Sequence, residues 1–236
     1  MTKLCIVCPP KLLKWSTIAD AEFYQSEWVT EEQDHPLSYC GRLAIVDVQH
    51  VSSTGASDSN ASITTLASAA MHVGATEVVV PDILQNSSRT LLIARDFLNA
   101  PPSPLQRLSK MFIPQGISIP DWIDCLRAAV NEFGHLFNTV GIPKVLEKHC
   151  SRKVLIDYIP LKYDIHMLGT WKGCKDFFRS HRVRSWDTSL PFAAAQQNST
   201  LGLDGILYKP DLLMGDNHPN VSVLIENIRF IQSLIG

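Results

Sequence analysis

The sequence predicts an α/β protein that folds as a single (β/α)8 TIM-like barrel. Two observations lead to this prediction: short apolar runs recur along the chain, and helical patterns fill most of the intervals between them. Several runs are almost continuously apolar, such as Leu43–Val46 and Val78–Val80, which is typical of parallel strands buried on both faces. Alternating strands and helices indicate a parallel sheet, and eight strands indicate its closure into a barrel.

The expected strands, in chain order, are Lys3–Cys8, Leu43–Val48, Glu77–Asp82, Met111–Gln115, Leu136–Gly141, Asp164–Gly169, Val183–Asp187 and Gly205–Tyr208. The expected helices are Ala61–His72, Ser87–Leu98, Pro120–Phe133, Lys172–Ser180 and Asn220–Ile235. The third of these helices shows the clearest boundaries, because proline and Asp121 open its first turn and Gly134 follows its last residue.

Two regions fit the strand–helix pattern poorly. Lys11–Gly41 is rich in charged and aromatic residues, and we interpret it as an irregular, elaborated first crossover. Leu201–Asn220 is rich in Gly, Asp and Pro, and we interpret it as a C-terminal loop over one mouth of the barrel. No stretch has the composition of an interdomain linker, so we expect residues 1–236 to form one domain.

Composition narrows the functional classes only slightly. The 21 basic and 23 acidic residues give a net charge of -2, so a nucleic-acid-binding surface would have to be local. No signal-peptide pattern follows Met1 and no apolar run is long enough to span a bilayer, so we expect a cytoplasmic protein without membrane contact. The six scattered cysteines are expected to be reduced. Cys5-x-x-Cys8 has no partner pair, so we expect no bound metal.

Polar residues and glycines follow the expected strands, at the end of a barrel where active sites form. They are Asp47, Asp82, Gln115, Gly116, Gly141, His166, Gly169 and Asp187. Each residue also has a structural interpretation. Asp187, for example, could cap a helix that begins at Leu190, and His166 could be a core histidine. Their shared position favours a functional site with Asp187 at its centre.

The series Asp82, Pro114-Gln115-Gly116, Val140-Gly141-Ile142-Pro143, His166-Met167-Leu168-Gly169 and Asp187-Thr188-Ser189-Leu190-Pro191 resembles the tRNA-guanine transglycosylase superfamily. The chain is most similar to the short members of bacteriophages and bacterial DNA-modification clusters, which insert 7-deazaguanine bases into DNA. The resemblance covers roughly Leu43 to Ala195. It depends on the order and spacing of the motifs, because Gln-Gly and Leu-Gly dipeptides are common.

The resemblance implies that guanine in DNA is replaced by a free 7-deazapurine base, such as the nitrile precursor of queuosine (preQ0). Asp187 would attack C1′ and form a covalent glycosyl–enzyme intermediate, and Asp47 would be the general acid/base. Base-binding positions would be Asp82, Gln115, Gly116, Gly141, His166, Leu168 and Gly169. The target guanine would be flipped out of a duplex or single-stranded, and no cofactor is implied.

The sequence departs from the family pattern in two places. Asp47 is followed by Val48-Gln49-His50 instead of a glycine-containing turn, so His50 or Asp58 could share its role. No cysteine follows Cys174, so the zinc module of the tRNA enzymes is not expected. The absence of that module favours DNA over tRNA as the polymer.

Basic residues precede Asp187 and are candidates for phosphate contacts, although they could equally form a solvated helix face. They are Lys172, Lys175, Arg179, Arg182 and Arg184. Three other functions stay open at this point. The protein could be a non-catalytic nucleic-acid-binding partner on the same barrel, a tRNA-directed transglycosylase, or an unrelated barrel glycosidase or nucleoside hydrolase. The sequence does not predict the oligomeric state, and a phage-encoded protein would act in the host cytoplasm.

Overall fold

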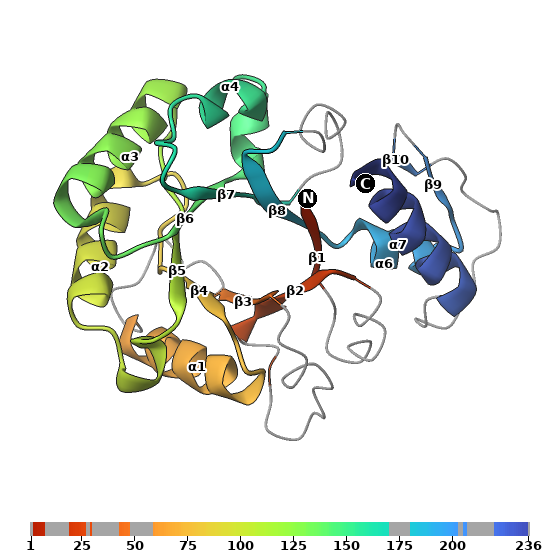
Figure 1. The fold of residues 1–236 in the computed structure, drawn as a ribbon, viewed down its shortest axis with the longest axis horizontal. Helices are drawn as coiled ribbons and strands as arrows, with labels where there is room; N and C mark the ends of the chain where they lie inside the picture. The colour runs from red at the N-terminus through yellow and green to blue at the C-terminus, as the bar shows by residue number, and fades with distance from the viewer. Residues whose placement is uncertain are drawn as a thin grey trace.

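A computed structural model of the chain describes residues 2–7, 19–26, 29, 43–47, 59–169, 180–202, 205–206 and 220–235. Within these ranges, eight parallel strands close into a barrel in which the last strand pairs with the first (Figure 1). The strands are β1 (Lys3–Val7), β2 (Ala21–Gln25), β3 (Leu43–Asp47), β4 (Glu77–Val79), β5 (Ser109–Phe112), β6 (Thr139–Ile142), β7 (Asp164–Met167) and β8 (Val183–Thr188). The predicted (β/α)8 TIM-like barrel is therefore confirmed.

The membership of the barrel differs from the prediction at two strands. β2 lies inside the region that we interpreted as a first crossover, and it pairs with β1 and β3. The predicted strand Gly205–Tyr208 does not belong to the barrel. Its described part, β10 (Gly205–Ile206), instead pairs antiparallel with β9 (Leu201–Gly202) in a separate two-stranded sheet. Four predicted helices are confirmed to within two residues, as α1 (Ser59–His72), α2 (Ser87–Asn99), α3 (Ile119–Phe133) and α7 (Val221–Ile235).

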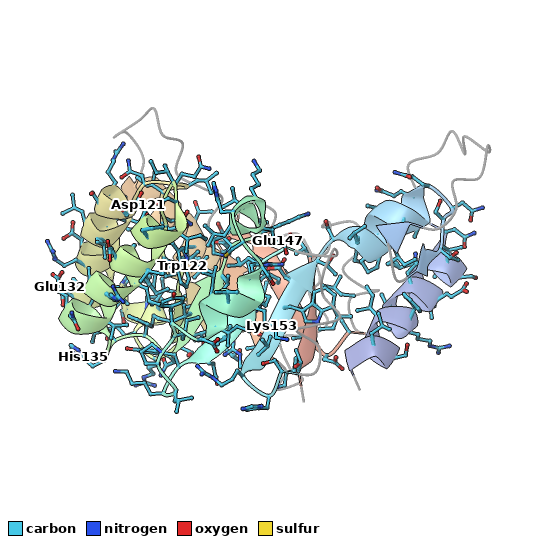
Figure 2. The ribbon with its side chains drawn as sticks, turned by 90° about the horizontal axis from the view of Figure 1, so that it is seen from above. Asp121, Trp122, Glu132, His135, Glu147 and Lys153 are labelled. Carbon is cyan, nitrogen blue, oxygen red and sulfur yellow. The ribbon has the colours of Figure 1, made fainter. Side chains whose placement is uncertain are left out.

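Side chains cap α2 and α3 at their N-termini. The Asn86 side chain accepts a hydrogen bond from the backbone N–H of Arg89, and the Ser118 side chain accepts one from Asp121. Asp121 and Trp122 lie at one end of α3, and Glu132 and His135 lie at the other (Figure 2). Because α3 runs back along the barrel after β5, its Asp121 end marks the carboxyl ends of the strands.

Three short helical segments accompany these elements: η3 (Ser103–Leu105), η4 (Lys144–Lys148) and α4 (Arg152–Ile156). The predicted helix Lys172–Ser180 lies outside the described residues except for Ser180. None of the described helices combines the length and the apolar character that crossing a membrane requires.

The strands separate two groups of buried side chains. The larger group fills the space between the barrel wall and the helices, and includes Trp122, Phe133 and Trp186. A smaller group fills the inside of the barrel and consists of Cys5, Ala21, Phe23, Ile45, Val79, Met111 and Ile113. The interior is thus packed by side chains, which leaves space for a ligand only at an end of the barrel.

After β8 the chain forms a part that lies beside the barrel, made of α6 (Leu190–Gln196), β9, β10 and α7 (Figure 1). Helix α7 packs on α6, and the buried Asn227 side chain accepts from the N–H of Leu201 and donates to the carbonyl of Ser199. β9 and β10 lie next to α7, so the described part of Leu201–Asn220 does not cover a barrel mouth as predicted (Figure 1).

Candidate functional site

A cavity of about 280 Å³ opens at the carboxyl end of the barrel. Its size is close to the lower end of the range for small-molecule sites, which begins at about 300 Å³. The polar groups in its wall come from Gln25, Asp47, Gln115, Lys144 and Asp187. Apolar side chains complete it, among them Phe23, Ile113 and Leu168. The predicted location of the site, at the carboxyl ends of the strands, matches the location of this cavity.

Asp187 lies near the end of β8 and is 5% exposed. Its Oδ1 accepts a hydrogen bond of 2.8 Å from the backbone N–H of Gly169, and its Oδ2 lies 3.0 Å from Nε2 of His166. The capping interpretation of Asp187 is excluded, because the N-cap of α6 is Ser189 and its side chain makes no capping bond. Asp187 is instead an oriented carboxylate in the cavity wall.

Gly169 supplies that backbone N–H from a conformation that few other residues adopt. Its φ angle is +47°, in the left-handed region. A lack of room for a side chain is not the reason for a glycine here, because a Cβ would meet Lys144 carbons only at 3.9 and 4.0 Å. The requirement is therefore conformational: glycine lets the chain turn after β7 so that the N–H points at Asp187.

Asp47 is the last residue of β3 and also lines the cavity, with 8% of its surface exposed. It stands in register with Gln25 of β2, which lines the same cavity. Asp47 and Asp187 thus reach one cavity from two separate strands, as a pair of carboxylates with different roles requires. The alternative residues His50 and Asp58 lie outside the described part of the chain.

Gln115 presents its amide to the cavity in a defined orientation. Its Oε1 accepts a 3.0 Å hydrogen bond from the backbone N–H of Gln85, and its Nε2 donates to a carboxylate oxygen of Asp82. A backbone N–H only donates and a carboxylate only accepts, so these partners fix which end of the amide is nitrogen. For the second Nε2 hydrogen, no partner lies among the described residues. Asp82 itself is 2% exposed and is not part of the cavity wall. It holds Gln115, and its own contact with the base stays a prediction.

Gly116 and Gly141 were predicted to line the base pocket, but neither belongs to the cavity wall. A Cβ on Gly116 would come within 2.7 Å of the backbone nitrogen of Trp122, so this glycine lets the connection after β5 approach the first turn of α3. A Cβ on Gly141 would come within 2.8 Å of Ile113 Cγ1 and of Leu168 Cδ1. Gly141 therefore leaves room behind two side chains that form the wall.

His166 lies one layer deeper than predicted. It is fully buried and is not part of the cavity wall, so it stands behind Asp187 instead of contacting a ligand. Its Nδ1 lies 2.8 Å from the hydroxyl oxygen of Ser185. Its ring stacks on Phe23, with a centroid distance of 5.8 Å and an interplanar angle of 15°. The cavity reaches only Leu168 and Gly169 from this segment.

Two of the predicted phosphate contacts are at the wrong end of the barrel. Arg182 donates a 2.9 Å hydrogen bond to the carbonyl of Ile159, just before β8. Arg184, at the start of β8, forms a 2.6 Å ion pair with the buried Glu77. Both guanidinium groups are therefore engaged at the amino end of the strands, away from Asp187. Lys172, Lys175 and Arg179 lie outside the described residues.

Sequence reasoning missed Lys144 and Gln25. Lys144 follows β6 by two positions, so the criterion that found Gln115 and Gly169 could have found it. Gln25 could not be found in this way, because the strand that carries it was not predicted.

A buried arginine holds the two loops that form one side of the cavity. Arg152 Nη1 donates to the carbonyls of Ile142, at 3.1 Å, and Leu168, at 2.7 Å. Its other terminal nitrogen forms a 2.7 Å ion pair with Glu147, which lies in the same connection after β6 (Figure 2). The Arg152 side chain thus joins the ends of β6 and β7. It thereby also fixes the positions of the loops that carry Lys144 and Gly169.

Cys5 stands beside Asp187 in the barrel register but is not a second nucleophile. Burial, reinforced by the charge of Asp187, raises the pKa of its thiol far above the ordinary value. A thiol that does not ionise is unreactive, because the thiolate is the nucleophile. Among the described residues, no group of three His, Cys, Asp or Glu side chains could hold a metal ion.

A scan against models of protein families and a search of curated proteins both give no match for this chain. What the site does is therefore inferred from its residues and their geometry.

Proposed function

We propose that this protein is a base-exchange glycosyltransferase that replaces guanine in DNA with a 7-deazaguanine, through a covalent intermediate on Asp187. The observation that supports this proposal best is the environment of Asp187, whose carboxylate lies in a cavity wall between two hydrogen-bond donors. The resemblance of the strand-end series to the tRNA-guanine transglycosylase superfamily supports the same chemistry.

The exchange proceeds in two displacements. A carboxylate oxygen of Asp187 attacks C1′ while the bond from C1′ to the purine N9 breaks, and Asp47 protonates the departing guanine. Asp47, now a carboxylate, then removes the N9 proton of the incoming 7-deazapurine. That nitrogen attacks C1′ and the ester bond to Asp187 breaks, which restores both residues. A carboxylate suits both steps, because it attacks an oxocarbenium-like centre well and later leaves well.

The cavity suits a single planar base. Its volume of about 280 Å³ leaves little room beyond one heterocycle and its sugar. Phe23, Ile113 and Leu168 offer apolar surface, and the oriented amide of Gln115 offers a donor for the polar edge of a purine. Since the site lies inside a barrel end, a base in a duplex would have to be extruded to reach it.

Lys144 supports a substrate that carries phosphate. It is exposed, lines the cavity and lies next to Gly169, whose N–H holds the nucleophile. If C1′ of a nucleotide were placed at Asp187, the flanking phosphates would lie outside the cavity, on the side of this ammonium. A free nucleoside would make no use of such a charge.

The test is incubation of a guanine-containing DNA oligonucleotide with the protein and preQ0. Nucleosides are analysed by mass spectrometry and covalent complexes on a denaturing gel, and a parallel reaction with tRNA tests the choice of polymer. We expect modified deoxynucleosides and a protein–DNA adduct. Release of free guanine without any incorporation would support a hydrolase instead, and DNA binding without either product would support a non-catalytic partner.

Asp187→Asn should abolish the adduct and lower exchange by at least about 10³-fold, because the amide cannot act as the nucleophile. The control is Asp157→Asn, the same substitution at an exposed position at the end of α4, which should leave exchange unchanged. An Asp187→Asn variant that still forms the adduct at the normal rate would exclude Asp187 as the nucleophile.

A further inference from the structure

A continuous series of polar side chains runs from Asp187 down through the barrel to its opposite end. His166 Nε2 lies 3.0 Å from Asp187 Oδ2, and His166 Nδ1 lies 2.8 Å from Ser185 Oγ. Ser185 Oγ accepts a longer, 3.4 Å hydrogen bond from Arg184 Nε, and the Arg184 guanidinium donates to Glu77. His166, Ser185 and Glu77 are fully buried. Polar groups at such depth are maintained only when they are paired with one another.

An irregularity in β8 brings this series together. Ile165 pairs with Val183 and the next residue, His166, pairs with Ser185, so Arg184 is an extra residue opposite a single step of β7. In a regular strand, Arg184 and Ser185 would point to opposite faces. With the bulge, both hydroxyl and guanidinium reach the barrel interior, and Ser185 meets the imidazole of His166.

The hydrogen-bond chemistry of these groups determines where the imidazole proton lies. Arg184 Nε can only donate, so it occupies a lone pair of Ser185 Oγ. The carboxylate oxygen of Asp187 can only accept, so Nε2 of His166 must carry a hydrogen. The Ser185 hydroxyl also lies near the thiol of Cys5, but sulfur is a weak acceptor compared with an imidazole nitrogen. The hydroxyl proton is therefore directed at Nδ1, which leaves the imidazole proton on Nε2.

We propose that His166 is a positioning residue for the nucleophile, held by Ser185 in the tautomer that donates from Nε2 to Asp187 Oδ2. Together with the Gly169 N–H on Oδ1, this donor fixes the plane of the carboxylate. Because His166 lies behind the cavity wall, Oδ2 faces the barrel interior and Oδ1 is the oxygen that attacks C1′. The tautomer follows from the geometry alone, whereas its consequence for the reaction rests on the proposed function.

The tautomer can be measured without any substrate, by ¹⁵N nuclear magnetic resonance of histidine-labelled protein at neutral pH. His166→Gln identifies the His166 signals by removing them, and His135→Gln, at an exposed site, is the matched control. We expect His166 in the wild-type protein to show a protonated Nε2 and an unprotonated Nδ1. In Ser185→Ala, which removes only a hydroxyl, we expect the Nδ1 signal to shift because Nδ1 loses its hydrogen bond, while the Asp187 carboxylate keeps a proton on Nε2. A proton on Nδ1 in the wild-type protein, or an unchanged spectrum in Ser185→Ala, would overturn the proposal.

The catalytic consequence is measured as the single-turnover rate of adduct formation. Ser185→Ala should slow this rate by about 10- to 100-fold with little change in KM for the free base, because a misoriented nucleophile slows the chemical step and leaves the base contacts intact. His166→Gln can still place an amide donor near Oδ2 and should retain more activity than His166→Leu. Equal activity in all three variants and the wild-type protein would overturn the positioning role. Absence of any adduct with the wild-type protein would instead contradict the proposed function, and the resonance measurement would still decide the tautomer.

Discussion

Gly141 lies behind the cavity wall, where an added methyl group would meet Ile113 Cγ1 and Leu168 Cδ1 at 2.8 Å and Met111 Sδ at 3.3 Å. Gly141→Ala should therefore lower the free energy of unfolding by about 1–3 kcal/mol, since overpacking forces neighbours to shift. Ile113 and Leu168 both line the cavity, so their displacement should also raise KM for the base. Urea unfolding and exchange kinetics measure the two effects. Unchanged stability together with an unchanged KM would show that the wall has room to spare.

Lys144 gives a second prediction for a single residue. Replacing it by glutamine should weaken DNA binding and reduce the slope of log K against log salt concentration by about one, because one phosphate contact is lost. Lys162→Gln is the matched control, since Lys162 is exposed but precedes β7 at the amino end of the barrel. Binding titrations at several salt concentrations provide the slopes. A slope that changes equally in both variants would contradict a specific role for Lys144.

For single residues, the sequence identified the correct strand ends but not how deeply each side chain is buried. Asp47, Asp187, Gln115 and Gly169 were expected at the site and lie in its wall. His166 was expected beside them. It lies on β7, two positions before Leu168, and faces the same barrel interior, but it is one layer of side chains deeper than the cavity wall. Arg184 was expected at the surface. The bulge in β8 directs it inward, and no alternation of polar and apolar residues reveals a bulge.

Among the elements, β2 shows why strand prediction failed where it did. Its sequence, Ala-Glu-Phe-Tyr-Gln, contains two polar residues in five and follows a charged region, so no apolar run marked it. This segment is a strand because its backbone pairs in parallel with β1 on one side and with β3 on the other. Gly205–Tyr208 carries a short apolar run, but its described residues pair with β9 outside the barrel, because local composition does not determine which strand a segment pairs with.

The ends of β6 and β7 depend on Arg152, which gives a prediction at this scale. Arg152→Leu should lower the free energy of unfolding by about 3–5 kcal/mol, since it removes the ion pair of the partly buried Glu147 and the hydrogen bonds that Arg152 donates to the carbonyls of Ile142 and Leu168. It should also slow exchange, because the loop that carries Gly169 loses its support. Urea unfolding followed by circular dichroism measures the change in stability.

Arg95→Gln is the matched control for Arg152→Leu, because it also removes an arginine that is paired with a glutamate. The Arg95–Glu132 pair lies on the exposed faces of α2 and α3, where water and salt screen it. We expect no measurable change in stability for this variant. Similar losses of stability in the two variants would mean that the buried Arg152–Glu147 pair contributes no more to stability than the exposed Arg95–Glu132 pair.

For the whole molecule, closure of the barrel is what assembles the site. Asp187 on β8 stands in register with Cys5 on β1, so the proposed nucleophile lies next to the seam where the first and last strands pair. Asp47 reaches the cavity from β3, two strands beyond that seam. Detachment of β1 would separate the two carboxylates, and the site therefore depends on pairing between strands from distant parts of the sequence.

Cysteine reactivity can test whether that seam opens separately from the rest. Burial raises the pKa of Cys125 in α3 to about 11, and it raises the pKa of the Cys5 thiol still further. A raised thiol pKa means less thiolate at pH 8, so both residues should resist a thiol reagent until the protein unfolds. Cys150 is only half-buried, and although burial also raises its pKa, it should react in the native state. Mass spectrometry of labelled peptides distinguishes these sites from Cys8, Cys40 and Cys174.

We expect Cys5 and Cys125 to be labelled at the same low rate in the absence of denaturant, and both rates to rise together as urea is added. This outcome follows if β1 leaves the barrel only when the whole barrel unfolds, because its pairing with β2 and β8 is part of one cooperative sheet. Labelling of Cys5 well before Cys125 would show instead that β1 detaches on its own. In that case the exchange activity should disappear at the urea concentration at which Cys5 becomes reactive, while α3 and its neighbours are still folded.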